Sequence, residues 1–273
     1  MTNLKAAQKN PTWTGMVPVD DTALAVTDTG GTGIPVIYLN GSFGSQRHWK
    51  RVIADLGPGY RHISFDERAR GRSKLSADYS FEACVRDIDA VLAARGVDRP
   101  LLVGWSYGAL LGVHWADRQR DRALGVVGVD GPFPVGWTDE AGHAEIRQVF
   151  RRMKPMLPIA RRLGLAGRFS AEVHAELAIE AHHLHDALEP ILVNLPVPVR
   201  YVVASGEGTG SRDDLQEQMR KAIDPLLDRN PNLQVSAKVS SDHGTILRKD
   251  SPAVADAVRE LAPSPRDKEQ PNR

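Results

Sequence analysis

One serine of the chain lies between two glycines, in the run Gly104-Trp105-Ser106-Tyr107-Gly108. The residues before it, 100–105, are apolar and typical of a buried strand, and residues 109–116 after it form an apolar helical pattern. A sharp strand-to-helix turn here would present the Ser106 hydroxyl above the strand end, where the N-terminus of the helix stabilises negative charge. The flanking glycines would leave room for the strand and the helix to approach each other. The pattern predicts a nucleophilic serine, and the alternative is an ordinary turn serine.

A serine hydroxyl is a weak nucleophile, so it needs a base that takes its proton. His243 lies in Ser-Ser-Asp-His-Gly, after the last predicted strand and before the last predicted helix, where a loop could return it to Ser106. The other histidines lie in predicted helices or early in the chain. We therefore predict that His243 is the base, and the alternative for any single histidine is a surface or core residue.

Six short apolar segments alternate with helical patterns, which predicts a mostly parallel sheet with helices on both faces, an α/β fold. The segments are residues 33–39, 60–65, 100–105, 123–129, 199–204 and 233–239. The clearest helix covers residues 81–95, where apolar side chains recur at helical spacing between a capping Ser80 and a terminating Gly96. A last helix is expected at residues 252–261.

Residues 131–196 follow a different pattern, with helical runs and no convincing buried strand. We expect them to form a helical cap inserted into a core of residues 13–130 and 197–262, above the strand ends where open α/β sheets bind ligands. The cap is rich in arginine, which could attract an anionic substrate or carrier, although a solvated helical face explains the same residues. Residues 1–12 and 263–273 are polar or proline-rich, and we expect both to be disordered tails.

Two further motifs lie directly after predicted strands. The first is Asn40-Gly41-Ser42-Phe43-Gly44-Ser45, followed by Trp49, and the second is Asp66-Glu67-Arg68-Ala69-Arg70-Gly71-Arg72-Ser73. In this order and spacing, with the Ser106 pentapeptide and His243, they make residues 13–261 resemble the α/β-hydrolase fold family. Two positions depart from the family pattern: this chain has Asn40 where the family has a histidine, and Ala69 where the family has a glycine. The resemblance implies the α/β-hydrolase fold for this chain.

The resemblance also implies an oxyanion hole, in which two backbone N–H groups bind the negative charge that develops on a carbonyl oxygen. One donor would be Tyr107, the residue after the nucleophile. The second would be Ser42, in the loop after the predicted strand 33–39, with Phe43 as the alternative donor.

An acid must fix the tautomer of the imidazole and stabilise its protonated form. The family usually carries this acid after the strand that is here 199–204, but Thr209 stands where aspartate is expected and Glu207 sits on the turn itself. Some members, including some dehalogenases and lactone hydrolases, carry the acid one strand earlier, where this chain has Asp130. We therefore predict Asp130 as the acid and keep Glu207 as the alternative. Asp130 could otherwise only cap the turn that follows it.

These residues predict a serine hydrolase that cleaves a carboxylic ester, lactone or thioester through an acyl-enzyme, with no cofactor and no metal. The substrate is expected to be a small, partly apolar molecule in a pocket lined by Phe43, Trp105, Phe133 and Trp137. The same triad would serve acyl transfer or cyclisation, a C–C hydrolase or a cofactor-free haloperoxidase, and a receptor with little turnover could retain it. A serine nucleophile argues against haloalkane dehalogenase or epoxide hydrolase activity, because those relatives use aspartate.

Composition excludes several classes of protein. The 35 basic and 34 acidic residues give a net charge of +1, without the basic excess of a nucleic-acid-binding protein. One cysteine, Cys84, allows no intramolecular disulfide, and no apolar run resembles a signal peptide or a membrane span. We therefore expect a cytoplasmic protein without a nucleic-acid or membrane partner, either a monomer or a homodimer.

Overall fold

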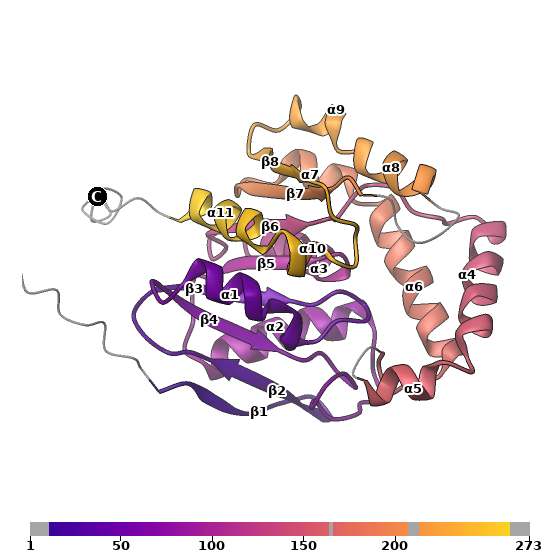
Figure 1. Cartoon of the computed structure of the whole chain (residues 1–273), viewed down its shortest axis with the longest axis horizontal. Helices are drawn as coiled ribbons and strands as arrows, with labels where there is room; N and C mark the ends of the chain where they lie inside the picture. The colour runs from indigo at the N-terminus through magenta and orange to yellow at the C-terminus, as the bar shows by residue number, and fades with distance from the viewer. Residues whose placement is uncertain (1–10, 164–165, 207–212, 263–273) are drawn as a thin grey trace, which may run out of the picture.

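The computed structural model describes residues 11–163, 166–206 and 213–262, which form one sheet with helices on both faces and at one end (Figure 1). The strands are β1 (Trp13–Val19), β2 (Thr22–Asp28), β3 (Ile34–Leu39), β4 (Tyr60–Phe65), β5 (Leu101–Trp105), β6 (Gly125–Val129), β7 (Val199–Ala204) and β8 (Leu233–Val239). The helices are η1 (Gln46–Trp49), α1 (Lys50–Leu56), α2 (Phe81–Ala94), α3 (Tyr107–Arg118), α4 (Glu140–Met153), α5 (Leu157–Arg162), α6 (Ala171–Asp186), α7 (Glu189–Asn194), α8 (Asp213–Lys221), α9 (Asp224–Leu227), α10 (Ile246–Lys249) and α11 (Ser251–Leu261). Residues 1–10 and 263–273 of the expected tails lie outside the described residues.

The eight strands are ordered β1-β2-β4-β3-β5-β6-β7-β8 across the sheet. The β1–β2 and β2–β4 pairs are antiparallel, and all the other neighbouring strands are parallel. The six strands predicted from apolar runs are all present, with bounds within two residues of those expected. The prediction of a mostly parallel α/β sheet is therefore confirmed.

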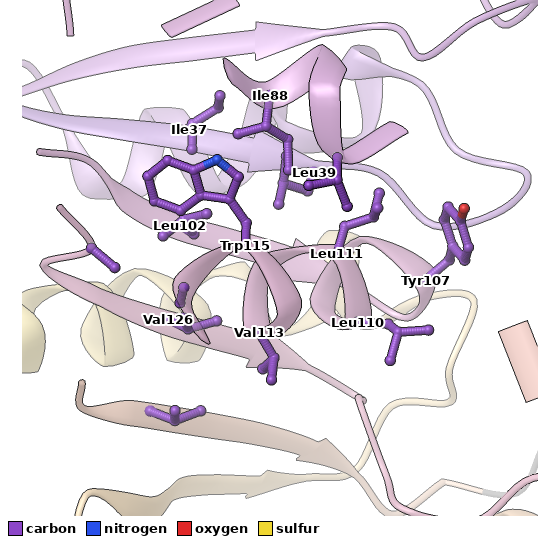
Figure 2. Close-up of a cluster of buried hydrophobic side chains, with 14 of the residues drawn as sticks. Ile37, Leu39, Ile88, Leu102, Tyr107, Leu110, Leu111, Val113, Trp115 and Val126 are labelled. Carbon is purple, nitrogen blue, oxygen red and sulfur yellow. The ribbon is translucent and has the colours of Figure 1, made fainter. Parts of the chain in front are cut away.

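Alternate side chains of the central strands enter two separate cores, because successive residues of a strand point to opposite faces of the sheet. On β3, Ile37 and Leu39 enter one core, and Val36 and Tyr38 enter the other. The first core is completed by α2 and α3, and Figure 2 shows Trp115 and Leu111 of α3 packed against strand residues. The second core is completed by α1 and α11. The sheet is therefore covered on both faces and presents only its strand ends to ligands.

Helix α2 shows why the local sequence signals were reliable. The Ser80 side chain accepts a hydrogen bond from the backbone N–H of Ala83, which caps the first turn. Gly96, just past the helix end, adopts a φ of 60°, a left-handed conformation that favours glycine. The apolar stripe between these two signals is buried, namely Phe81, Cys84, Val85, Ile88, Val91 and Leu92.

The segment between β6 and β7 contributes α4, α5, α6 and α7, of which α4, α5 and α6 stand together beyond the strand ends (Figure 1). This group has a small apolar core of its own, formed by Ile146, Phe150, Leu157, Ala166, Ala171, Ala175 and Ile179. We call the segment the cap and the remainder the core. Arg168 joins them, because its guanidinium donates to the backbone oxygens of Gly71 and Ser73. None of the described helices is long and apolar enough to cross a membrane.

Candidate active site

Ser106 occupies the turn between β5 and α3 with a φ of 55° and a ψ of −116°. This backbone conformation is rare for a residue with a side chain, and such strain is concentrated at functional sites. The two flanking glycines are required by close contacts. A Cβ on Gly104 would lie 2.3 Å from the Gly108 oxygen, and a Cβ on Gly108 would lie 2.1 Å from the Leu39 oxygen. The glycines therefore allow the strand and the helix to meet closely enough to hold Ser106 in its strained position.

Replacing Gly108 with alanine is expected to lower the free energy of unfolding by about 3 kcal/mol or more, because backbone atoms have to move to admit the new Cβ. Gly59→Ala is the matched control, since a Cβ there meets nothing within 4 Å. We expect the control to change stability by no more than about 0.5 kcal/mol. Urea denaturation followed by circular dichroism measures both. Equal stability of the two variants would contradict the close-contact explanation.

The register of β5 and β6 brings Ser106 and Asp130 together. Trp105 and Val129, the last residues of the two strands, are paired, so the next residue of each strand emerges at the same level of the sheet. The backbone N–H of Ser106 donates to the Val129 oxygen at 3.0 Å, and that of Asp130 donates to Val202 at 2.8 Å. Asp130 is buried and also adopts a positive φ, of 46°.

His243 completes the group predicted from the sequence. Its Nδ1 lies 2.7 Å from Oδ2 of Asp130. The His243 ring also packs against Trp105, with 5.6 Å between ring centroids, and the Trp105 Nε1 donates to the His243 backbone oxygen at 3.1 Å. Nε2 makes no hydrogen bond to any described residue. With Nδ1 donating to the carboxylate, Nε2 keeps its lone pair available for a proton.

A cavity of about 440 Å³ opens over these residues. It lies between the strand ends, the loop after β3, and helices α6 and α8. Its lining residues are Ser42, Phe43, Ser106, Tyr107, Asp130, Gly131, Phe133, Ala178, Ala181, His182, His185, Met219, Arg220 and His243. The structure thus brings the three residues of the predicted triad and both predicted oxyanion donors to one cavity.

Comparison with known proteins relates this geometry to the α/β-hydrolase fold. A profile of the α/β-hydrolase fold matches residues 34–161. A haloalkane dehalogenase of Mesorhizobium japonicum is 33% identical over 109 residues, which cover 40% of this chain and 35% of the dehalogenase. An esterase from Thermogutta terrifontis is similar in structure, with a TM-score of 0.69 and 19% identity over 92% of this chain and 99% of that chain. The thioesterase domain of the curacin biosynthetic pathway is also similar, with a TM-score of 0.68 and 17% identity over 92% of this chain and 100% of that chain.

The chain has the α/β-hydrolase fold. The sequence match spans only about a third of the curated relative's length. The structural neighbours have identities below 25%, so they show the fold of this chain and leave its reaction to be argued from the site.

The loop after β3 holds the predicted oxyanion donors of this α/β-hydrolase. The backbone N–H groups of Ser42 and Tyr107 have no acceptor among the described residues. The start of the loop is fixed by Asn40, whose backbone N–H and Nδ2 each donate to the Glu67 carboxylate at 2.9 Å, while its Oδ1 accepts from Trp49 at 2.8 Å. Asn40, in place of the family histidine, thus anchors the loop. Burial raises the pKa of Glu67 to about 7.

Arg220, on α8, is a residue of the site that sequence reasoning missed. Its Nε and Nη2 donate to Oδ1 and Oδ2 of Asp130, each at 3.0 Å. Burial raises the pKa of Asp130, but the hydrogen bonds from His243 and Arg220 outweigh burial and lower it. The carboxylate is therefore shared between an imidazole and a guanidinium. No sequence motif connects the two positions, which are 90 residues apart.

Two of the four residues predicted to line the pocket, Phe43 and Phe133, do so, whereas Trp105 and Trp137 do not. Trp105 packs into the core on one face of the sheet and supports the His243 loop from behind. Trp137 packs against the cap core and stacks on His182, with 5.0 Å between centroids. The prediction that Trp105 and Trp137 line the pocket is therefore wrong. Their residue type is typical of an apolar pocket, but it does not determine the direction in which each side chain packs. Glu207 and Thr209 lie outside the described residues.

Proposed function

We propose that this α/β-hydrolase is a serine hydrolase that cleaves a carboxylic ester, lactone or thioester through an acyl-enzyme. One observation carries the proposal. Ser106 is held on a strained turn in the same cavity as His243, and the Nδ1 of His243 is bound to a buried carboxylate at 2.7 Å. This arrangement supports a serine nucleophile with an oriented base.

In the proposed reaction, the Ser106 oxygen attacks the carbonyl carbon and Nε2 of His243 takes the hydroxyl proton. The negative charge on the carbonyl oxygen is bound by the backbone N–H groups of Ser42 and Tyr107, each worth about 2.7–4 kcal/mol of barrier. His243 then protonates the leaving alcohol or thiol. A water molecule, activated by His243, releases the acyl group from Ser106.

A serine nucleophile favours acyl substrates over the haloalkanes of the sequence relative. Attack by Ser106 on an alkyl halide would form an ether, which water does not cleave, so the enzyme would not turn over. Attack on a carbonyl forms an ester, which the same base and oxyanion donors can hydrolyse. The esterase and thioesterase among the structural neighbours agree with this choice.

The cavity supports a small, partly apolar substrate. Its volume of about 440 Å³ suits a small molecule, and Phe43, Phe133 and Met219 are among its apolar lining. His185, also in the lining, bonds the Phe133 oxygen through Nδ1 at 2.8 Å, and burial lowers its pKa to about 4. His185 is then neutral near pH 7 and offers hydrogen bonding without charge.

The experiment that tests the proposal combines a fluorophosphonate probe with a series of p-nitrophenyl and thioester substrates of increasing acyl length. We expect the probe to label Ser106, located by mass spectrometry of peptides, and at least one substrate to turn over. Absence of labelling in folded protein would refute the proposal. Labelling without turnover across the series would replace hydrolysis with the function of a ligand-binding receptor.

Replacing Arg220 with glutamine is expected to raise the pKa of Asp130, because the guanidinium hydrogen bonds help to lower it, and so to move the acidic limb of the kcat/KM pH profile to higher pH. Arg220→Lys keeps the charge and should keep the limb near its original pH. Arg229→Gln removes an exposed cation paired with Glu189 and serves as the control. If the acidic limb of the pH profile is unchanged in Arg220→Gln, Arg220 has only a structural role.

A further inference from the structure

A second cavity, of about 740 Å³, lies between the core and α5 of the cap. It shares no lining residue with the active-site cavity. The segment 42–48 contributes to both, with Ser42 and Phe43 on the active-site side and Ser45 to His48 on the other. We call it the basic cavity, lined by Thr27, Ser45, Gln46, Arg47, His48, Lys50, Ile53, Ser64, Asp66, Gly71, Arg72, Arg161, Arg162 and Leu163.

The charge of this cavity is strongly one-sided. Its lining holds five basic side chains, three from the core (Arg47, Lys50, Arg72) and two from the cap (Arg161, Arg162). The single carboxylate, Asp66, is buried and already accepts hydrogen bonds from two Gln46 nitrogens and the Arg72 backbone N–H, each at 3.0 Å. The chain as a whole has a net charge of only +1, so positive charge is concentrated here.

Two basic residues of the cap that lie outside this cavity have acidic partners. Arg147 pairs with Glu176 at 2.8 Å, and Lys154 pairs with Glu172 at 3.0 Å. By contrast, none of the five basic residues of the cavity forms an ion pair with a described residue. Arg161 is further held by a bond from Nη2 to the Phe169 oxygen, while its buried Nε has no partner in the described part of the chain. The positive charge of the cavity is therefore not neutralised by acidic side chains of the described residues.

We propose that the basic cavity binds a phosphate-bearing ligand with two or more negative charges, which bridges the core and the cap. Guanidinium groups match phosphate oxygens in paired hydrogen bonds, and several cations around one space favour a multiply charged anion. The volume lies within the range of about 300–1,000 Å³ that is common for small-molecule sites. Because cations from both walls would be neutralised together, binding should hold α5 against the core.

The phosphate could belong to a free compound or to the headgroup of an anionic lipid. At the edge of the cavity, Leu163 of its lining and the nearby Met156 and Ile159 are 62%, 69% and 64% exposed. Their spacing places them on one side of α5 and its two capping residues, where they could contact the apolar part of a lipid. The shared chemistry is the phosphate group, and the experiment separates the two sources.

The test measures binding of inorganic pyrophosphate to the full chain by calorimetry, and binding to vesicles of phosphatidylcholine with or without phosphatidylglycerol by sedimentation. The variant Arg47→Glu with Arg162→Glu changes one exposed cation on each wall. Arg151→Glu with Arg152→Glu is the matched control, because it makes the same charge change at exposed positions of α4 outside both cavities. Thermal melting by circular dichroism establishes that both variants fold.

We expect binding to the unmodified chain and to the control, and binding weaker by at least about tenfold in the cavity variant. Pyrophosphate binding with this pattern supports a free phosphate ligand. Vesicle binding that requires phosphatidylglycerol and is lost in both the cavity variant and Ile159→Asp supports a lipid headgroup. Failure of the unmodified chain to bind either probe, or equal binding by the two charge variants, would overturn the proposal. None of these outcomes depends on hydrolysis at Ser106.

Discussion

Replacing Ser106 with alanine is expected to lower kcat for any hydrolysed ester by on the order of 10⁵- to 10⁶-fold, since no other group in the cavity would be aligned for attack. The strained turn does not require the hydroxyl, and alanine is smaller than serine, so the fold should persist. Steady-state kinetics on the best substrate of the series measures the effect. Ser236→Ala, which removes a surface hydroxyl bonded to Glu260, is the control and should retain full activity.

The size of the residual rate decides the interpretation of this variant. Oxyanion donors and substrate binding alone would leave a rate about 10³- to 10⁴-fold above that of water. Activity above one per cent of the original would show that Ser106 is not the nucleophile. Loss of fluorophosphonate labelling in the same variant distinguishes a missing nucleophile from contamination of the preparation by another esterase.

Replacing Asp130 with asparagine is expected to lower kcat by about 10⁴-fold. An amide presents only one acceptor oxygen, so it cannot accept bonds from both His243 and Arg220 as the carboxylate does, and it can hold the imidazole in the wrong tautomer. Glu207→Gln, which changes the alternative acid, should stay within about threefold of the original rate. The reverse pattern, with Glu207→Gln inactive and Asp130→Asn active, would transfer the role of the acid to Glu207.

The Asp130 variant needs a stability control, because the carboxylate also pairs with Arg220 and accepts from the Ala204 N–H at 3.1 Å. Breaking a buried pair from one side can destabilise a protein by about 3–5 kcal/mol. Urea denaturation of the variant gives this loss, and kinetics should be measured well below its melting temperature. A kcat that falls while the folded fraction remains constant identifies a catalytic effect.

The parts of the site that could be predicted from the sequence are those that depend on local signals. Ser106 lies in a short pattern of strand, glycine and helix, and the Asp130 carboxylate directly follows a continuous apolar strand. The positions of these two residues follow once the sheet is known to be parallel. Helix α2 was predicted correctly for the same reason, because its signals are local in the sequence. Ser80 and Gly96 mark its ends, and the spacing of its apolar residues marks its buried face.

The parts that could not be predicted depend on packing between distant segments. Arg220 lies on a helix rich in charged residues, and its choice of Asp130 among many carboxylates is decided by how α8 packs over the strand ends. Trp105 and Trp137 have the residue type of pocket-lining side chains, yet one supports the His243 loop and the other stacks on His182. The charge of the basic cavity also appears only when core and cap are brought together.

The carboxylate of Asp130 comes from the end of β6 but accepts a hydrogen bond from Ala204, the last residue of β7. It therefore lies beside the ends of both neighbouring strands. A carboxylate placed at the end of β7 would therefore start close to the same imidazole that Asp130 contacts from the end of β6. Moving the acid from the usual position after β7 to Asp130, after β6, is then a short distance in three dimensions. Along the chain, the same move spans many residues.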